Sequence, residues 1–314
     1  MISRISLAFL ATSALFASSC AAEAPQNEAK QVSAPAPVET VAETTAFSAP
    51  DAAWRDVDQA DLMYIDSNHG QIIVELYPEI SPKHVAQIKA LVGKKFYDYI
   101  TFHRVIEGFM NQTGDPKGDG TGDSDMPNIE AEFSFRRDPG MGVTLVGTRP
   151  LQQGNPGRGE VGVGFYKGLP VATLPSAQAI ATKDGKVHAF GLHCKGVTSM
   201  ARSSDPNSAN SQFFLMRGTA THLDAAYSIW GNTVWGHENL TKIKVGAKGE
   251  TPGFVPDKMD KVRMGTDLAV EQQRAVQVID TSSPAFKNYL KTFKKDDGTY
   301  PDICDIPVPT RLKP

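Results

Sequence analysis

Two short blocks of sequence, residues 102–112 and residues 211–214, constrain the fold of this chain more than any other feature. The first reads Phe-His-Arg-Val-Ile-Glu-Gly-Phe-Met-Asn-Gln and the second reads Ser-Gln-Phe-Phe. Together they supply a permanent cation with a rigid fork of donors, a side-chain amide and several large, adaptable apolar side chains. A fold that brings both blocks to one shallow site can bind a small apolar ring beside a backbone amide, which is what a proline in a peptide presents.

The sequence around these blocks predicts many short strands and few helices. Residues Leu62–Asp66 and Gln71–Tyr77 are typical of a strand pair, since the second run is rich in β-branched and aromatic side chains. Ser81 and Pro82 predict a helix start, as a cap and a first-turn proline, and Gly93 predicts its end. Further strands are expected at 101–106, 109–113, 196–201, 212–216 and 227–230, with a second helix near 239–245. Such a pattern indicates a mainly β barrel or sandwich.

The two blocks also carry a family resemblance. The segments FHRVIEGFMNQTGDP (102–116) and GVTSMARSSDPNSANSQFF (196–214) are similar to the two signature segments of the cyclophilin-type peptidyl-prolyl cis-trans isomerases. The similarity covers about residues 60–245 and is interrupted by one large insertion. It implies a closed, eight-stranded antiparallel barrel capped by two helices.

The resemblance implies an enzyme that rotates X-Pro peptide bonds in proline-containing polypeptides, with no cofactor and no metal. Amide resonance opposes this rotation with a barrier of ~18–20 kcal/mol, and the enzyme need only bind the twisted amide more tightly than the planar one. The family pattern gives Arg104 the catalytic role, as a donor to the proline nitrogen when its lone pair develops. The substrate-binding residues that it implies are Phe109, Met110, Gln112, Ala201, Arg202, Gln212, Phe214, His222, Leu223 and Tyr227.

Three positions depart from the family pattern. His222 stands where eukaryotic members carry a tryptophan that contacts cyclosporin, so weak inhibition by that drug is expected. Tyr227 replaces a pocket histidine, and Asn210 replaces a glycine beside Gln212. None of these changes removes Arg104, Gln112 or the apolar residues that the resemblance places around the proline. His103 is given no role, because the reaction moves no proton.

An insertion at about 134–195 is rich in glycine and proline and shows no clear periodicity until its end. It adds roughly fifty residues to the family pattern, and a loop that long is usually functional or disordered. A flap beside the site, a partner-docking segment and a simple decoration of the barrel all remain open. The alternative to an enzyme is therefore a non-catalytic cyclophilin-fold binding or chaperone module of the cell envelope, in which the insertion covers or repurposes the groove.

The first fifty residues predict export. Residues 1–19 combine Arg4 with a short apolar run, as in a signal peptide, and the run is too short to span a bilayer. The sequence Ala17–Cys20 resembles a lipoprotein signal, in which Cys20 would be acylated and would anchor a periplasmic protein to the membrane. Ordinary cleavage near Ala21 or Ala22, which leaves a soluble protein, is the alternative. Residues 20–50 contain almost no large apolar side chain and predict a flexible linker.

The remaining residues, 51–314, are expected to form one cyclophilin-like domain with a C-terminal extension from about 250. Cys194 and Cys304 predict a disulfide in an oxidising compartment, with two buried thiols as the alternative. A net charge of −3 gives no electrostatic case for nucleic acid. No cysteine or histidine spacing suggests zinc, and the run Asp115–Asp125 lacks the glycine and glutamate of a calcium-binding EF-hand loop.

Overall fold

A computed structural model describes residues 47–151 and 159–313. The expected signal segment, Cys20 and the linker up to residue 46 lie outside the described residues. The folded unit begins at Phe47, whose ring centroid lies 4.8 Å from that of Tyr289. Residues 47–50, which were assigned to the expected linker, belong to the compact unit, because the aromatic ring of Phe47 packs into it. Within these ranges, no helix is both long and apolar enough to cross a membrane.

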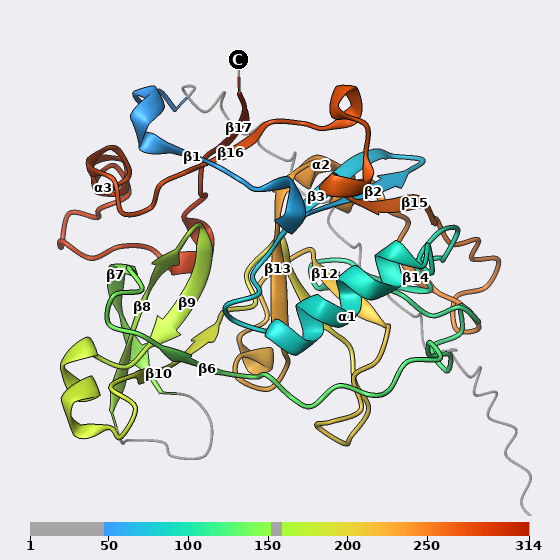
Figure 1. The fold of residues 1–314 in the computed structure, drawn as a ribbon, viewed down its shortest axis with the longest axis horizontal. Coiled ribbons are helices and arrows are strands. Elements are labelled where there is room, and N and C mark those ends of the chain that lie inside the picture. The colour runs from blue at the N-terminus through green and yellow to red at the C-terminus, as the bar shows by residue number, and fades with distance from the viewer. Residues whose placement is uncertain (1–46, 152–158, 314) are drawn as a thin grey trace, which may run out of the picture. The chain divides into compact units, whose positions relative to one another are not determined.

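The largest element is a curled antiparallel sheet of nine strands (Figure 1), whose strands contribute to one of the apolar core clusters of the fold. The strands, in spatial order, are β14 (Gly246–Ala247), β4 (Arg104–Ile106), β5 (Met110–Thr113), β12 (Phe213–Met216), β11 (Val197–Met200), β13 (Ile229–Trp235), β3 (Gly70–Leu76), β2 (Leu62–Ser67) and β15 (Met259–Met264). The expected closed eight-stranded barrel is not confirmed, because in the described chain the edge strands β14 and β15 do not pair. An isolated bridge joins Thr101 to Lys258 near these edges, where Tyr99 adopts a φ of 66° that interrupts an extended path.

Two helices pack against this sheet. Helix α1 (Pro82–Gly93) and helix α2 (His237–Lys242) bury apolar side chains, such as Ile88 and Leu240, in the same core as the strands. The start of α1 differs from the prediction, since the Ser81 side chain makes no cap hydrogen bond. Its hydroxyl donates instead to the carbonyl oxygen of Ile229 at 2.6 Å, which ties the helix to β13.

The insertion forms a second antiparallel sheet, which lies beside the first (Figure 1). Its strands, in spatial order, are β6 (Phe135–Arg137), β10 (Val187–Gly191), β9 (Leu169–Thr173), β8 (Glu160–Tyr166) and β7 (Thr144–Pro150). The described residues of the insertion therefore form regular strands, although their sequence shows no clear periodicity. Glycine is part of the reason for the sheet: a Cβ on Gly164 would lie 2.3 Å from the Thr144 carbonyl oxygen, so only glycine lets β7 and β8 approach this closely.

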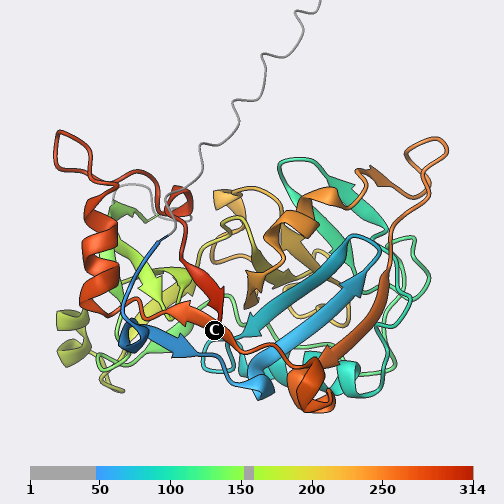
Figure 2. The ribbon, with the colours of Figure 1, turned by 90° about the horizontal axis from the view of Figure 1, so that it is seen from above.

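The C-terminal region adds a strand to the nine-stranded sheet, two strands to a third sheet and a helix. Strand β15 lies within the expected extension from about 250 and pairs with β2 as an edge of the nine-stranded sheet. Strands β1 (Trp54–Asp56), β16 (Val276–Ile279) and β17 (Thr310–Leu312) then form a three-stranded sheet. Helix α3 (Pro284–Lys291) lies on the same side as the inserted sheet (Figure 2), and the Phe286 ring packs edge-on against Phe165 at 5.5 Å.

Candidate active site

A small cavity of about 130 Å³ opens where β4, β5 and β12 meet the segments that follow β11 and Leu223. The lining residues are Arg104, Phe109, Met110, Gln112, Ala201, Arg202, Phe214, Leu223 and Tyr227. All of them were predicted from the sequence. The two other predicted substrate-binding residues lie alongside: Gln212 is hydrogen-bonded to Gln112, and the His222 ring centroid lies 5.9 Å from that of Phe109.

The polar side of the cavity is a chain of side-chain hydrogen bonds. Arg104 Nη1 donates to Gln112 Oε1 at 3.2 Å, and Gln112 Nε2 donates to Gln212 Oε1 at 3.1 Å. Gln212 Nε2 in turn donates to the carbonyl oxygens of Gly120 and Gly122 at 3.1 and 2.9 Å. The hydrogen-bond partners of Gln112 and Gln212 determine which end of each amide donates and which accepts. This chain of hydrogen bonds therefore fixes the orientation of the Arg104 guanidinium.

The aspartate- and glycine-rich run Asp115–Asp125 supports the far end of this chain of hydrogen bonds. The carboxylate of Asp115 accepts hydrogen bonds from the backbone N–H groups of Lys117 at 2.7 Å and Asp119 at 2.9 Å. Burial acts to raise the pKa of Asp115, but these and neighbouring backbone donors outweigh burial and lower it from its ordinary value. The run is therefore a rigid loop that presents the Gly120 and Gly122 carbonyls to Gln212.

The opposite side of the cavity is apolar. Met110, Phe214 and Leu223 are almost completely buried, with exposed fractions of 2%, 5% and 7%. The Tyr227 ring meets Phe214 edge-on at a centroid distance of 5.9 Å and forms one wall. The arrangement suits a small apolar ring that lies flat on the floor while its amide faces the polar side.

Arg202 stands at the rim and is held by aromatic rings. Its guanidinium carbon lies 4.5 Å from the Tyr227 ring centroid and 5.3 Å from that of Phe133. Its Nε and Nη2 atoms both donate to the carbonyl oxygen of Ala226 at 3.1 Å. Among the described residues, neither Arg202 nor Arg104 forms an ion pair with a carboxylate, so no close negative group offsets the two guanidinium groups at the cavity.

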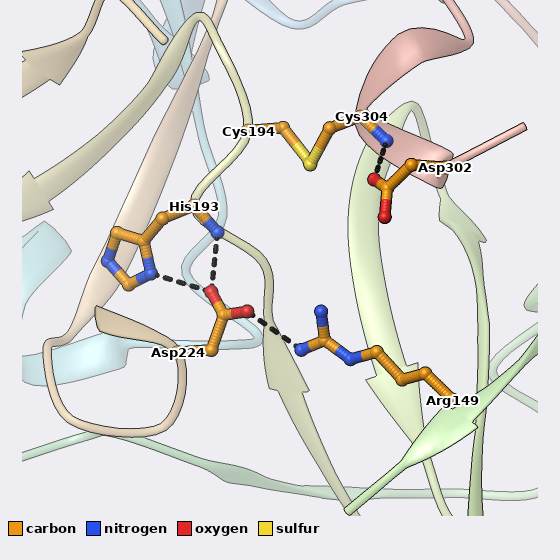
Figure 3. Close-up of a disulfide and its surroundings, with 6 residues drawn as sticks. All are labelled: Arg149, His193, Cys194, Asp224, Asp302 and Cys304. Atoms are coloured by element: carbon orange, nitrogen blue, oxygen red, sulfur yellow. Dashed lines mark hydrogen bonds and ion pairs between the residues drawn. A yellow bond between two sulfur atoms is a disulfide. The ribbon is translucent and has the colours of Figure 1, made fainter. Parts of the chain in front are cut away.

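A buried network behind the floor was missed by the sequence reasoning (Figure 3). His193 stacks on Phe214 with a centroid distance of 6.2 Å, and its ring and backbone contact the carboxylate of Asp224. Asp224 also pairs with Arg149 of β7 at 2.7 Å. The sequence points to these residues only through their neighbours: Asp224 directly follows Leu223, and His193 directly precedes Cys194.

The two remaining cysteines meet next to this network. Cys194 and Cys304 are joined by a disulfide with a Cα–Cα distance of 5.0 Å (Figure 3). A larger cavity, of about 420 Å³, lies beside the disulfide, and the cysteines are its only lining residues that were singled out from the sequence. In the described ranges, no group of three or more histidine, cysteine, aspartate or glutamate side chains is placed to hold a metal ion.

Comparison with known proteins agrees with this geometry. The family model for "Cyclophilin type peptidyl-prolyl cis-trans isomerase/CLD" matches residues 62–264. A probable peptidyl-prolyl cis-trans isomerase of Brucella suis is 34% identical over 211 residues, which cover 67% of this chain and 85% of that protein. A peptidyl-prolyl cis-trans isomerase-like 3 of Gallus gallus is 28% identical over 175 residues, which cover 56% of this chain and 76% of that protein.

The crystal structure of cyclophilin AquaCyp293 from Hirschia baltica is similar to this fold with a TM-score of 0.70 and 34% sequence identity. The match covers 82% of this chain and 93% of that one. The family match spans well over half of the chain and contains every lining residue of the small cavity. The chain therefore belongs to the cyclophilin-type peptidyl-prolyl cis-trans isomerases.

Proposed function

We propose that this isomerase acts on X-Pro bonds of exported polypeptides and thereby assists their folding. The observation that carries the proposal is the cavity in which Arg104, without a carboxylate partner among the described residues, faces the floor formed by Met110, Phe214 and Leu223. The cavity is small and open, so it fits a proline that is exposed in an unfolded or loop segment. The substrates that we propose are therefore flexible proline-containing chains.

The apolar and polar residues of the cavity have different roles in bond rotation. The proline ring rests on the apolar floor, which holds it while the preceding carbonyl group turns. Arg104 donates an N–H to the proline nitrogen, whose lone pair is exposed only when amide resonance is lost, so this contact stabilises the twisted state selectively. Gln112 orients Arg104 and offers its amide to the substrate backbone. No proton transfer is needed, which leaves His103 without a chemical role.

The proposed location is the periplasm, with a lipid anchor on Cys20. The support is the apolar leader that ends in small residues and a cysteine, followed by a linker poor in apolar side chains. The disulfide between Cys194 and Cys304 is in keeping with an oxidising compartment. A linker of this kind would let the isomerase reach chains at some distance from the membrane.

The non-catalytic binding module gains no support from the cavity. That alternative depended on an insertion that covers or replaces the groove, yet no described residue of the insertion lines the small cavity. Arg104, Gln112 and Phe214 all face it.

Two measurements test the proposal. The isomerisation rate of a short Ala-Pro peptide should rise steeply with the wild-type protein and fall by about a hundred-fold or more with Arg104→Ala, as expected when a preorganised donor is lost. A folded wild-type protein without activity would overturn the assignment of the site. For the location, the full chain should fractionate with membranes and incorporate labelled fatty acid, and Cys20→Ala should abolish both; a wild-type chain without label would overturn the anchor.

A further inference from the structure

We infer that Arg149, in the inserted sheet, is a positioning residue for isomerisation: through Asp224 and His193 it holds the walls of the proline pocket in place. The inference rests on the proposed site, and it gives the insertion a function in catalysis although it does not line the cavity. In Figure 3, the Asp224 carboxylate lies between the Arg149 guanidinium and the His193 ring.

Asp224 joins the inserted sheet to the pocket. It directly follows Leu223, a residue of the pocket floor. Its Oδ2 atom accepts a hydrogen bond from Arg149 Nη2 at 2.7 Å. Its Oδ1 atom accepts one from the His193 backbone N–H at 2.7 Å and lies 3.0 Å from His193 Nδ1. One carboxylate therefore fixes the position of three segments that are far apart in the sequence.

His193 carries this constraint to the pocket walls. Its side chain is completely buried and stacks on Phe214 with an interplanar angle of 23°. The same ring meets Tyr227 edge-on at a centroid distance of 6.4 Å. The His193 carbonyl oxygen also accepts the backbone N–H of Ala220 at 2.9 Å, which places the start of the loop that contains Leu223. A shift of His193 would thus move the floor and one wall together.

The negative charge of Asp224 makes Arg149 its necessary partner. The Asp224 side chain is only 7% exposed, so its negative charge needs a close positive group. Burial lowers the pKa of His193 more than Asp224 raises it, which keeps the imidazole neutral near neutral pH. Arg149, which also lies 5.9 Å from the Phe190 ring centroid, is the cation that pairs with this carboxylate. Removal of Arg149, whose side chain is 20% exposed, leaves the more deeply buried Asp224 carboxylate uncompensated, and the surrounding loop must move to solvate it.

The chain offers a matched control in the same sheet. Arg136 of β6 pairs with Asp184 at 2.6 Å, but this pair is far more exposed, at 34% and 45%, and neither residue lines the cavity or contacts a lining residue through an ion pair. Exposed pairs contribute little to stability. Arg136→Met should therefore leave both catalysis and folding unchanged.

The experiment measures kcat and KM for an Ala-Pro peptide with the full chain and the variants Arg149→Met, Arg149→Lys and Arg136→Met. For Arg149→Met we expect a KM about ten-fold higher with kcat changed by no more than about two-fold, since a misplaced wall weakens binding while Arg104 and Gln112 stay on β4 and β5. Arg149→Lys should restore most of the affinity by returning the charge. A merely structural ion pair would lower the amount of folded enzyme without changing KM.

An unchanged KM in folded Arg149→Met would overturn the inference. If that variant does not fold, Asp224→Asn and the double variant Asp224→Asn/Arg149→Met decide, because the neutral amide no longer needs the cation. The KM of the double variant should then equal that of Asp224→Asn within about two-fold, and a further rise in KM on losing Arg149 in this background would overturn the inference. If neither the wild type nor Arg136→Met accelerates isomerisation, the proposed function is overturned. If both are active and Arg149→Met has the wild-type KM, only the positioning role of Arg149 is overturned.

Discussion

Arg104 and Gln112 face each other across the β4–β5 ladder, and the guanidinium donates a hydrogen bond of 3.2 Å to the amide oxygen. The amide nitrogen of Gln112 donates one hydrogen bond to Gln212, and its oxygen faces the arginine, which has donors only. A neutral acceptor orients the cation without neutralising it. The activity should therefore depend on the amide being uncharged.

This dependence predicts the effect of Gln112→Glu. The carboxylate is nearly isosteric, but it would form a charge-assisted pair with Arg104 and would reduce the positive potential at the proline nitrogen. We expect the rate constant for Ala-Pro isomerisation to fall by about ten-fold or more, because the donor is then less available to the twisted amide. The melting temperature should change little, because the new pair with Arg104 offsets the lost hydrogen bond to Gln212. Gln178→Glu, which introduces the same charge at an exposed position of the insertion, should have wild-type activity, and equal losses in both variants would contradict this account.

The position of His222 predicts the response to cyclosporin. Its ring lies 5.9 Å from Phe109 at the edge of the cavity, where the family resemblance places a tryptophan in eukaryotic members. We expect weak inhibition of the wild-type protein and an inhibition constant about ten-fold lower for His222→Trp, since a large aromatic ring adds apolar contact area. The measurement is inhibition of Ala-Pro isomerisation. Phe109→Ala in the same background should cancel the gain, whereas tight inhibition of the wild type would show that the drug contact lies elsewhere.

The disulfide predicts a redox-dependent stability. It joins residues separated by 110 positions, and closing so long a loop restricts the unfolded chain. Reduction should lower the free energy of unfolding by about 3–4 kcal/mol, measured by urea denaturation with and without reductant. The double variant Cys194→Ala/Cys304→Ala should match the reduced wild type and should not respond to reductant. An unchanged wild-type midpoint under reduction would argue against a structural role for the bond.

Three histidines whose surroundings lower their pKa values predict the pH dependence of stability. Burial lowers the pKa values of His103, His193 and His237 from their ordinary value of 6.5. The unfolded chain therefore binds protons on these rings at a higher pH than the folded chain does. The free energy of unfolding should be constant above about pH 7 and should fall as the pH drops from about 6.5 toward about 5, before most carboxylates titrate. Urea denaturation across this range tests the prediction, and a flat profile would contradict it.

Much of the site could be predicted because its signals are local in the sequence. Arg104, Gln112 and Phe214 lie in two unbroken blocks, and paired antiparallel strands bring such blocks together with a fixed register, as β5 and β12 do. The helix over Pro82–Gly93 was also predictable from its first-turn proline and one apolar face. The role of Ser81 was not, because its hydroxyl bonds to Ile229, which is distant in the sequence.

The tertiary structure alone decided what lies behind the pocket. Glycine-rich strands such as β8 carry little periodicity, and Gly164 is explained only by the close approach of Thr144 on the neighbouring strand. The pairing of Arg149 with Asp224 has no counterpart in the sequence, where the two residues are 75 positions apart. Sequence by itself determined the chemistry of this site, because side-chain type and strand pattern are properties of short segments. Ion pairs and sheet closure depend on which distant segments meet, and the free energy of burying them together is a property of the whole fold.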